Sequence, residues 1–164
     1  MKYSAVYPGT FDPITYGHID VLKRSAKLFN GVIMGIAEGE HKKTLFPATE
    51  RLDLAQKALK GVKQVKIETF KGLAVNYVKS KNIKIVIRGL RMISDFEYEF
   101  QMALTNKHLN KTIETLFMMP KEKYAYISSS LIKEAAALGA DLGQFVPKPV
   151  EAALKKKLTK NNTP

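Results

Sequence analysis

The chain has 164 residues, the length of one domain, and 45% of them are apolar, which is enough for a packed core. Its 27 Lys and Arg outnumber its 15 Asp and Glu, and the net charge of +12 favours anionic partners such as nucleic acid, anionic lipid or phosphorylated small molecules. Cysteine is absent, which excludes disulfides, thiolate nucleophiles and cysteine-ligated metals.

Short apolar runs alternate with helical patterns along the chain. Gly61 and Gly139 each follow a helical pattern, where a glycine often ends a helix. No hairpin turn of the Asn-Gly type joins consecutive strands. In chain order we expect a strand at 4–7, a helix at 17–29, a strand at 32–37, a helix at 49–60, a strand at 65–69, a helix at 73–80, a strand at 83–87, a helix at 95–109, a strand at 113–118, a helix at 128–138 and a last helix after Pro149.

This alternation predicts βαβ units and therefore a doubly wound α/β fold. The sheet should be five-stranded and predominantly parallel, with helices on both faces. In such sheets, ligands bind at the carboxyl ends of the strands, near the point where the strand order reverses. We expect one domain over 1–158, followed by a short basic and polar tail at 159–164.

The loops after the predicted strands carry cations. His18 and Lys42 lie near the first two loops, Arg88 and Arg91 lie in the fourth, and three serines at 128–130 begin the helix after the fifth strand. Cations beside a helix N-terminus are typical of a phosphate site. The chain has neither a G-x-x-x-x-G-K-[ST] motif nor a G-x-G-x-x-G after its first strand, so a nucleotide would be held in another way.

The segment Thr15-Tyr16-Gly17-His18 offers such a way. Gly17 has no Cβ, so a ligand can pack against its backbone. Thr15 and His18 share one face of a first helical turn, where the helix dipole adds positive potential. His18 could donate a hydrogen bond to a phosphate, but a lone histidine near a helix start is more often a capping or surface residue. The three serines can likewise be read as N-caps or as phosphate-binding groups.

Three motifs carry a family resemblance. PGTFDPITYGH, at 8–18, resembles the first signature of the nucleotidylyltransferase superfamily, [HT]-x-G-H, and ISSSLIK, at 127–133, is similar to its second, ISS[ST]-x-[IV]-[RK]. RGLR at 88–91, followed by DFEYE at 95–99, resembles more narrowly the bacterial phosphopantetheine adenylyltransferases of coenzyme A synthesis, which have a Rossmann-like fold. The resemblance covers almost the whole chain apart from the basic tail.

The resemblance implies that the adenylyl group of ATP is transferred to 4′-phosphopantetheine, giving dephospho-coenzyme A and pyrophosphate. A phosphate monoester has a second pKa of about 6, so the acceptor is mostly ionised at neutral pH and can attack the α-phosphorus in line. No general base and no covalent enzyme intermediate are needed. Mg²⁺ is expected on the ATP phosphates, held mainly through them and water, and no protein-only metal site is expected.

The resemblance also implies roles for individual residues. His18 would be catalytic, stabilising charge on the α-phosphate. The expected ATP-binding residues are Thr10, Phe11, His18, Gly89, Leu90, Arg91, Glu99, Tyr124, Ala125, Tyr126, Ile127, Ser128, Ser129 and Ser130. The expected substrate-binding residues, toward 4′-phosphopantetheine, are Thr10, Lys42, Ala74 and Arg88. The alternative for Lys42 is a solvated basic loop, and the alternative for Arg88 and Arg91 is a pair of surface ion pairs.

Four positions depart from the family pattern. Thr15 stands where many relatives carry histidine, Ser130 replaces a threonine and Lys133 replaces an arginine. Ala74 replaces a bulkier apolar residue, so that its backbone rather than its side chain would meet the pantetheine arm.

The resemblance also implies a homohexamer.

Two other functions remain open for this chain. The first is another nucleotidylyltransferase, acting on nicotinate mononucleotide or glycerol phosphate, against which the Lys42 loop and the 88–99 stretch argue. The second is a basic nucleic-acid-binding module, but the chain shows no helix-turn-helix, RNP or zinc pattern, so we expect no nucleic-acid partner. No apolar run approaches the ~20 residues of a membrane helix, and we expect a cytoplasmic protein without a membrane partner.

Overall fold

The computed structural model describes residues 4–39 and 43–159, which form five strands and seven helices. In chain order these are β1 (Ser4–Gly9), α1 (Tyr16–Leu28), β2 (Gly31–Ala37), α2 (Ala48–Ala58), β3 (Val65–Phe70), α3 (Ala74–Ser80), β4 (Ile85–Gly89), α4 (Ile93–Leu109), β5 (Glu114–Met118), α5 (Glu122–Ala125), α6 (Ser129–Ala137) and α7 (Lys148–Thr159).

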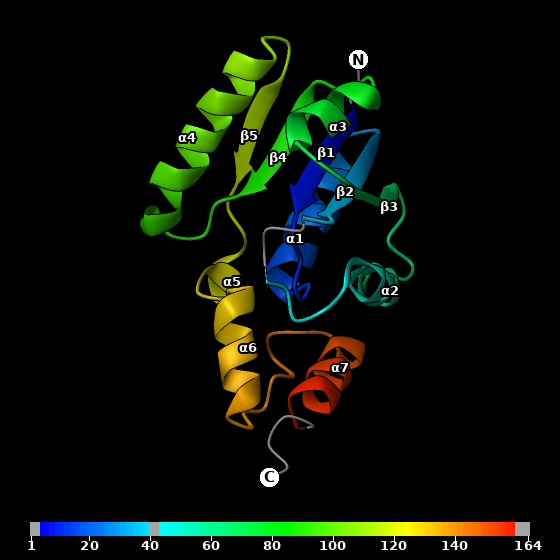
Figure 1. Cartoon of the computed structure of the whole chain (residues 1–164), viewed down its shortest axis with the longest axis vertical. Helices are drawn as coiled ribbons and strands as arrows, with labels where there is room; N and C mark the ends of the chain where they lie inside the picture. Colours follow the sequence, from blue (N-terminus) through cyan, green and yellow to red (C-terminus); the bar gives the residue numbers. More distant parts are fainter. Residues whose placement is uncertain (1–3, 40–42, 160–164) are drawn as a thin grey trace.

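The strands form one parallel sheet in the order β3-β2-β1-β4-β5 (Figure 1). In the central strand, Val6 is in register with Ile33 of β2 on one side and with Val86 of β4 on the other. The chain winds outward from β1 to β3 and then crosses back to β4, so the strand order reverses between β1 and β4. The predicted doubly wound, parallel five-stranded sheet is confirmed.

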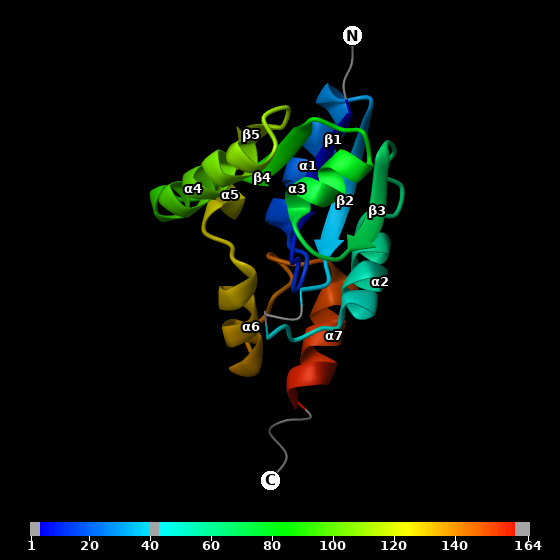
Figure 2. The same cartoon turned by 45° about the horizontal axis from the view of Figure 1, so that its top comes forward.

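Helices pack on both faces of the sheet because successive strand residues point to opposite sides. Ala5 and Tyr7 of β1 join a buried cluster with side chains of α1, α2, α6 and α7. Val6, between them, joins a second cluster with α3. Figures 1 and 2 show α4 beside β5, and α6 and α7 beyond the carboxyl ends of the strands. No helix in the described ranges is both long and apolar enough to cross a membrane.

The element boundaries differ from the sequence-based expectation at a few places. The single helical turn α5 was not expected, because four residues are too few to show a helical period. Helix α7 begins at Lys148 and includes Pro149, which a first turn tolerates because its N–H needs no helical partner there. Gly61 and Gly139 have φ values of +84° and +80°, which confirms them as the glycines that follow helix ends.

Candidate active site

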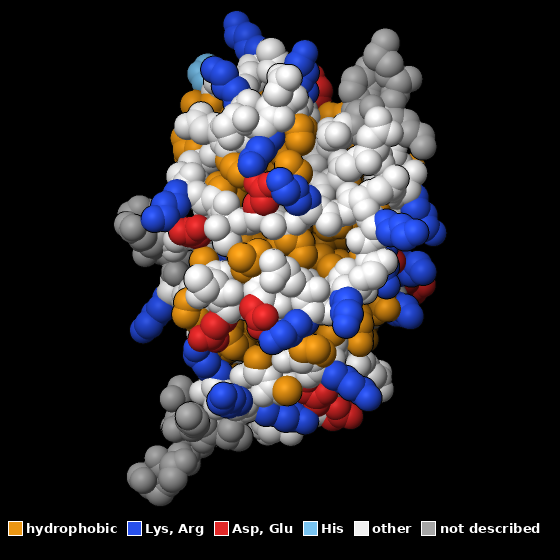
Figure 3. All heavy atoms as spheres, turned by 90° about the vertical axis from the view of Figure 1, so that its right-hand side faces the viewer, with side chains coloured by type: hydrophobic (Ala, Val, Ile, Leu, Met, Phe, Trp, Pro, Cys, Tyr) orange, Lys and Arg blue, Asp and Glu red, His pale blue; other side chains and the backbone are white. Residues whose placement is uncertain are grey.

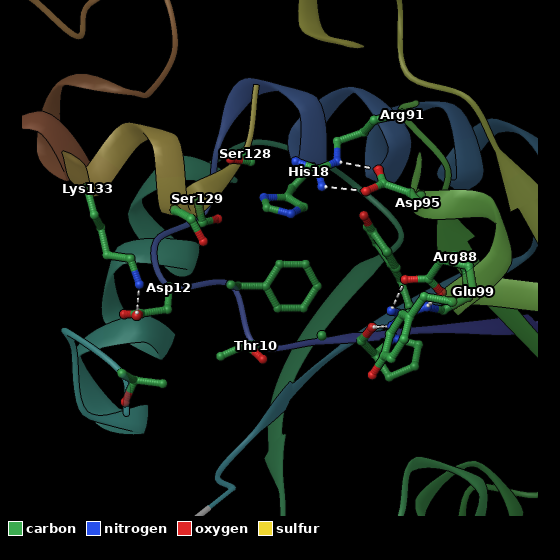
Figure 4. A pocket seen from close by; sticks show the side chains of 18 of the residues that line it. Thr10, Asp12, His18, Arg88, Arg91, Asp95, Glu99, Ser128, Ser129 and Lys133 are labelled. Carbon is green, nitrogen blue, oxygen red and sulfur yellow. Dashed lines mark hydrogen bonds and ion pairs between the residues drawn. The ribbon is translucent and has the colours of Figure 1, made fainter. Parts of the chain in front are cut away.

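A pocket of about 490 Å³ opens at the carboxyl ends of β1 and β4, where the strand order reverses. Its walls come from the loops after β1, β2 and β4 and from the first two turns of α1, α4 and α6 (Figure 4). The pocket therefore lies where the topology predicts a ligand site. Ten of the predicted residues meet there: Thr10, Phe11, His18, Arg88, Gly89, Arg91, Glu99, Ser128, Ser129 and Ser130.

A smaller cavity of about 50 Å³ shares Tyr7, His18, Gly89 and Arg91 with this pocket. Its other lining residues are Thr15, Gly17, Val21, Pro120 and Ile127. Pro120 and Ile127 bracket the segment that contains α5. This cavity thus extends the pocket toward the segment 124–127, whose residues are among those expected to bind ATP.

The other predicted residues that the structure describes lie outside both cavities. Leu90 donates its backbone N–H to the Met118 carbonyl, which ties the loop after β4 to the end of β5. Tyr124 and Tyr126 belong to the α5 segment, and Ala74 begins α3 and packs against the cluster around Val6. Ala125 ends α5. Lys42 lies outside the described residues, while its neighbour Lys43 lines the pocket.

His18 is the third residue of α1 and completes a capping box with the N-cap Thr15. The Thr15 N–H donates to His18 Nδ1 at 3.1 Å, so a neutral ring carries its proton on Nε2. Burial, together with the charges of Arg91 and Arg88, lowers the pKa of His18 to about 4. His18 is therefore a capping residue and a pocket residue at once, with a neutral imidazole that donates through Nε2.

Phe11 supports the ring of His18 from the loop after β1. Its ring is edge-on to His18, with 5.0 Å between centroids, and edge-on to Tyr7 at 5.3 Å. Phe11 has φ +50°, a left-handed backbone that is unfavourable by about 1–2 kcal/mol for a residue with a Cβ. A Cβ on Gly9 would lie 2.9 Å from the same ring, so this close approach requires glycine at that position.

The two arginines form ion pairs inside the pocket wall. Arg88 binds Glu99 through two hydrogen bonds of 2.6 Å, and its Nη1 donates to the Pro8 carbonyl at 2.6 Å. Burial disfavours its charge, but the hydrogen bonds and charge of Glu99 outweigh this and raise the pKa of Arg88. Arg91 is held in the same manner by Asp95, at 3.0 and 3.1 Å, and donates to the Ile127 carbonyl at 2.9 Å.

Each guanidinium has five N–H groups and uses three of them in these bonds, which leaves two for a ligand. The two arginines therefore do form ion pairs, as the alternative interpretation expected, Arg88 with Glu99 and Arg91 with Asp95. This pairing does not remove the arginines from the site, because both pairs line the pocket.

The serine motif begins helix α6 as an N-cap and also lines the pocket. Ser128 is the N-cap of α6 and accepts a hydrogen bond from the Leu131 N–H at 3.0 Å. Ser129 Oγ donates to the Pro13 carbonyl at 2.8 Å, which holds α6 against the loop after β1. Since Ser128, Ser129 and Ser130 all line the pocket, the N-terminus of α6 faces it.

Sequence reasoning gave no role to several residues that the fold brings to the pocket. Asp12 and Lys133 form an ion pair of 2.8 Å between residues 121 positions apart, which no local pattern could reveal. Asp95, four residues after Arg91, could have been found from its i,i+4 spacing. Other lining residues without a predicted role are Tyr7, Pro8, Gly9, Lys43, Thr44, Ser94 and Tyr98.

Comparisons with known proteins identify the family. Residues 6–135 match the model of the cytidylyltransferase-like family. The chain is 51% identical over 158 residues to a phosphopantetheine adenylyltransferase of Vesicomyosocius okutanii, covering 96% of this chain and 100% of the relative. It is 52% identical over 156 residues to that of Carboxydothermus hydrogenoformans, covering 95% and 96%.

A solved structure of a Vibrio parahaemolyticus protein, described as a nicotinate-nucleotide adenylyltransferase, has a TM-score of 0.71 over 94% of this chain and 99% of its own. At 18% identity this likeness shows a shared Rossmann-like fold alone. The near-full-length identity to the curated relatives goes further. The chain belongs to the phosphopantetheine adenylyltransferase family of nucleotidyltransferase enzymes.

Proposed function

We propose that this chain transfers the adenylyl group of ATP to 4′-phosphopantetheine, forming dephospho-coenzyme A and pyrophosphate. One observation carries the proposal: the pocket joins a neutral imidazole, two guanidiniums and a helix N-terminus at the reversal point of the sheet, in a chain about half identical to named phosphopantetheine adenylyltransferases. These groups bind and neutralise phosphates. Cysteine is absent, and the reaction needs no enzyme nucleophile.

In this mechanism His18 acts on the α-phosphate. Its Nδ1 already accepts from Thr15, so Nε2–H is the donor available to an oxygen on which charge develops. The acceptor phosphate is ionised at neutral pH and attacks in line, which leaves the protein the tasks of orientation and charge stabilisation. No covalent intermediate with the enzyme forms.

The two substrates would approach from different sides of His18. Arg91 and the α6 N-terminus would hold the β- and γ-phosphates of ATP, and the 124–127 segment would flank the adenine, which the small cavity at Ile127 favours. Thr10, Arg88 and Lys42 would hold the acceptor phosphate, and Ala74 would meet the pantetheine arm. The position of Lys43 in the pocket wall supports a cationic role for its loop.

Mg²⁺ would arrive with ATP and neutralise part of the triphosphate charge. The pocket carboxylates Asp12, Asp95 and Glu99 are each paired with a lysine or arginine. Among the described residues, no group of three or more His, Cys, Asp or Glu is arranged to hold a metal ion. These side chains favour a Mg²⁺ ion held through phosphates and water.

The excess of positive charge fits small anionic substrates better than a nucleic-acid backbone. On the face shown in Figure 3, Lys and Arg side chains are dispersed among acidic and hydrophobic ones and do not follow one groove.

We also propose a cytoplasmic homohexamer. The exposed apolar side chains of α4 support self-association, because a patch of this kind marks an interface.

Pyrophosphate release tests the proposal. Wild type should release pyrophosphate from MgATP only when 4′-phosphopantetheine is present, and His18→Ala should lower the turnover about 10²–10³-fold with the fold intact. His108→Ala, on the exposed end of α4, is the matched control and should retain activity. Release that requires nicotinate mononucleotide instead would replace the proposed acceptor, and near-normal turnover of His18→Ala would remove His18 from the chemistry.

A further inference from the structure

Asp12 is a buried carboxylate in the pocket wall to which the proposed mechanism gives no role. It is 4% exposed and lies between β1 and α1. Its Oδ2 accepts hydrogen bonds of 2.8 Å from the Leu45 N–H and from Lys133 Nζ, and its Oδ1 accepts one of 2.9 Å from the Phe46 N–H. One side chain therefore joins the loop after β1, the loop before α2 and helix α6; Figure 4 shows its ion pair with Lys133.

The loop before α2 is held from two sides at this point. Phe46 is 1% exposed, donates its N–H to Asp12 and accepts at its carbonyl from Arg51 Nε at 3.0 Å. Arg51 is itself 3% exposed and also donates to the Thr10 and Ala37 carbonyls. The buried anion Asp12 and the buried cation Arg51 thus fix Phe46. Phe46 lies two residues after Thr44 and three after Lys43, both of which line the pocket.

Charge alone does not explain a carboxylate in this place. Asp12 lines a pocket rich in cations, where a negative charge repels anionic ligands. Lys133 compensates for that charge, at the cost of a cation that faces the same pocket. The benefit of Asp12 must therefore be geometric, and the geometry that it controls is the backbone of Leu45 and Phe46.

We propose that Asp12 is a positioning residue for the acceptor substrate. By accepting from two consecutive backbone N–H groups, it holds the loop that presents Lys43 and Thr44 to the pocket. The inference rests on the proposed function, in which this loop meets the phosphate of 4′-phosphopantetheine.

The Asp12→Asn variant distinguishes the positioning of the loop by this side chain from the effect of its negative charge. The variant keeps the side-chain volume but replaces one acceptor oxygen with an NH₂ group that cannot accept from Leu45 or Phe46. Loss of the negative charge alone should lower the KM for both polyanionic substrates. Loss of positioning should instead raise the KM for 4′-phosphopantetheine about tenfold, the effect of one lost charged hydrogen bond, while the KM for ATP does not rise. Asp53→Asn, an exposed carboxylate on α2 paired with Lys57, is the matched control and should change neither constant.

Three results would overturn the proposal. An unchanged KM for 4′-phosphopantetheine with only a lower melting temperature would make Asp12 purely structural. A lower KM for both substrates would leave charge as its only effect. An equal rise in both constants would place its action on the whole pocket. The wild type, assayed beside the variant, tests the proposed function separately, since wild-type turnover that ignores 4′-phosphopantetheine would refute the reaction without any reference to Asp12.

Amide hydrogen exchange keeps the test open if Asp12→Asn does not fold. In the wild type, exchange at the amides of residues 43–46 should slow when 4′-phosphopantetheine is added and change little with a non-hydrolysable ATP analogue alone. In a folded Asp12→Asn protein, exchange at Leu45 and Phe46 should accelerate without substrate, because their acceptor is impaired. Unchanged exchange in the wild type on adding 4′-phosphopantetheine would contradict the inference.

Discussion

The His18 imidazole takes part in a structural and a chemical arrangement at once. Its Nδ1 belongs to the capping box of α1, and that bond assigns the proton of the neutral ring to Nε2. Burial and the neighbouring Arg91 and Arg88 keep the ring neutral, with a pKa of about 4. His18 therefore caps helix α1 and is also oriented and protonated as a hydrogen-bond donor before any substrate binds.

This arrangement predicts a loss of stability in mild acid. The pKa of His18 is about 4 in the folded chain, against an ordinary value of 6.5, so the unfolded state binds the proton first as the pH falls. The contribution of the neutral ring is complete above pH 6.5 and is lost between pH 6.5 and 4, by up to about 3 kcal/mol.

His18→Gln provides the comparison, because glutamine can accept from the Thr15 N–H in the same capping box but does not titrate. Urea unfolding at pH 7 and pH 4, at one chain concentration, should show a larger acid loss for wild type than for the variant. Glu68, whose pKa is lowered to about 2 chiefly by hydrogen bonds from Lys66 and Lys81, affects both proteins equally. Equal acid losses in the two proteins would show that His18 is not held neutral by the fold.

Contacts between residues close together in the sequence could be predicted, and contacts between residues far apart in the sequence could not. The Thr15–His18 pair and the Ser128 cap depend on spacings of three residues, which a helix translates directly into contacts. Asp12 meets Lys133 only after four further strands have been placed, and nothing in the two sequence neighbourhoods selects one partner over another.

At the scale of the element, helix α4 depends on a charged contact. Glu99 is the one buried residue among its 17, and it binds Arg88 of β4 through both carboxylate oxygens. Phe96, Phe100 and Leu104 recur every four residues, a spacing typical of a helix face that is buried, but these side chains are 43%, 45% and 56% exposed. Within the chain, α4 is attached to the sheet by this ion pair and by the contact of Phe96 with Phe117 of β5, while much of its apolar side stays exposed.

Glu99→Gln should therefore destabilise the chain more than Asp95→Asn. Removing one member of a buried bidentate pair leaves the other charge unpaired, which we expect to cost about 2–3 kcal/mol and to lower the melting temperature by about 5–10 °C. The Arg91–Asp95 pair has side chains 33% and 25% exposed, and its loss should cost less than about 1 kcal/mol. Scanning calorimetry of both variants at equal concentration tests the order, and an Asp95→Asn effect as large as that of Glu99→Gln would contradict it.

At the scale of the whole molecule, the fold and the place of the pocket could be predicted, because both follow from the alternation of strands and helices. Parallel strands connected by right-handed crossovers leave few topologies, and the reversal between β1 and β4 brings their two loops together. The sequence could not tell which apolar side chains the folded chain would leave uncovered. That depends on how far α4 lies from the two buried clusters, which only the assembled sheet decides.

The uncovered side of α4 predicts an assembly of several chains. Phe96, Phe100 and Leu104 recur every four residues on one face of the helix, and the rings of Phe96 and Phe100 stack at 5.5 Å. If copies of the chain meet there, Phe100→Asp would bury a carboxylate in an apolar contact, which costs several kcal/mol, and should shift a hexamer to smaller species in native mass spectrometry. Leu138→Asp, at an 88% exposed side chain after α6, is the matched control and should leave the mass unchanged. A wild type that is monomeric, or a Phe100→Asp variant with the wild-type mass, would show that this face does not join the subunits.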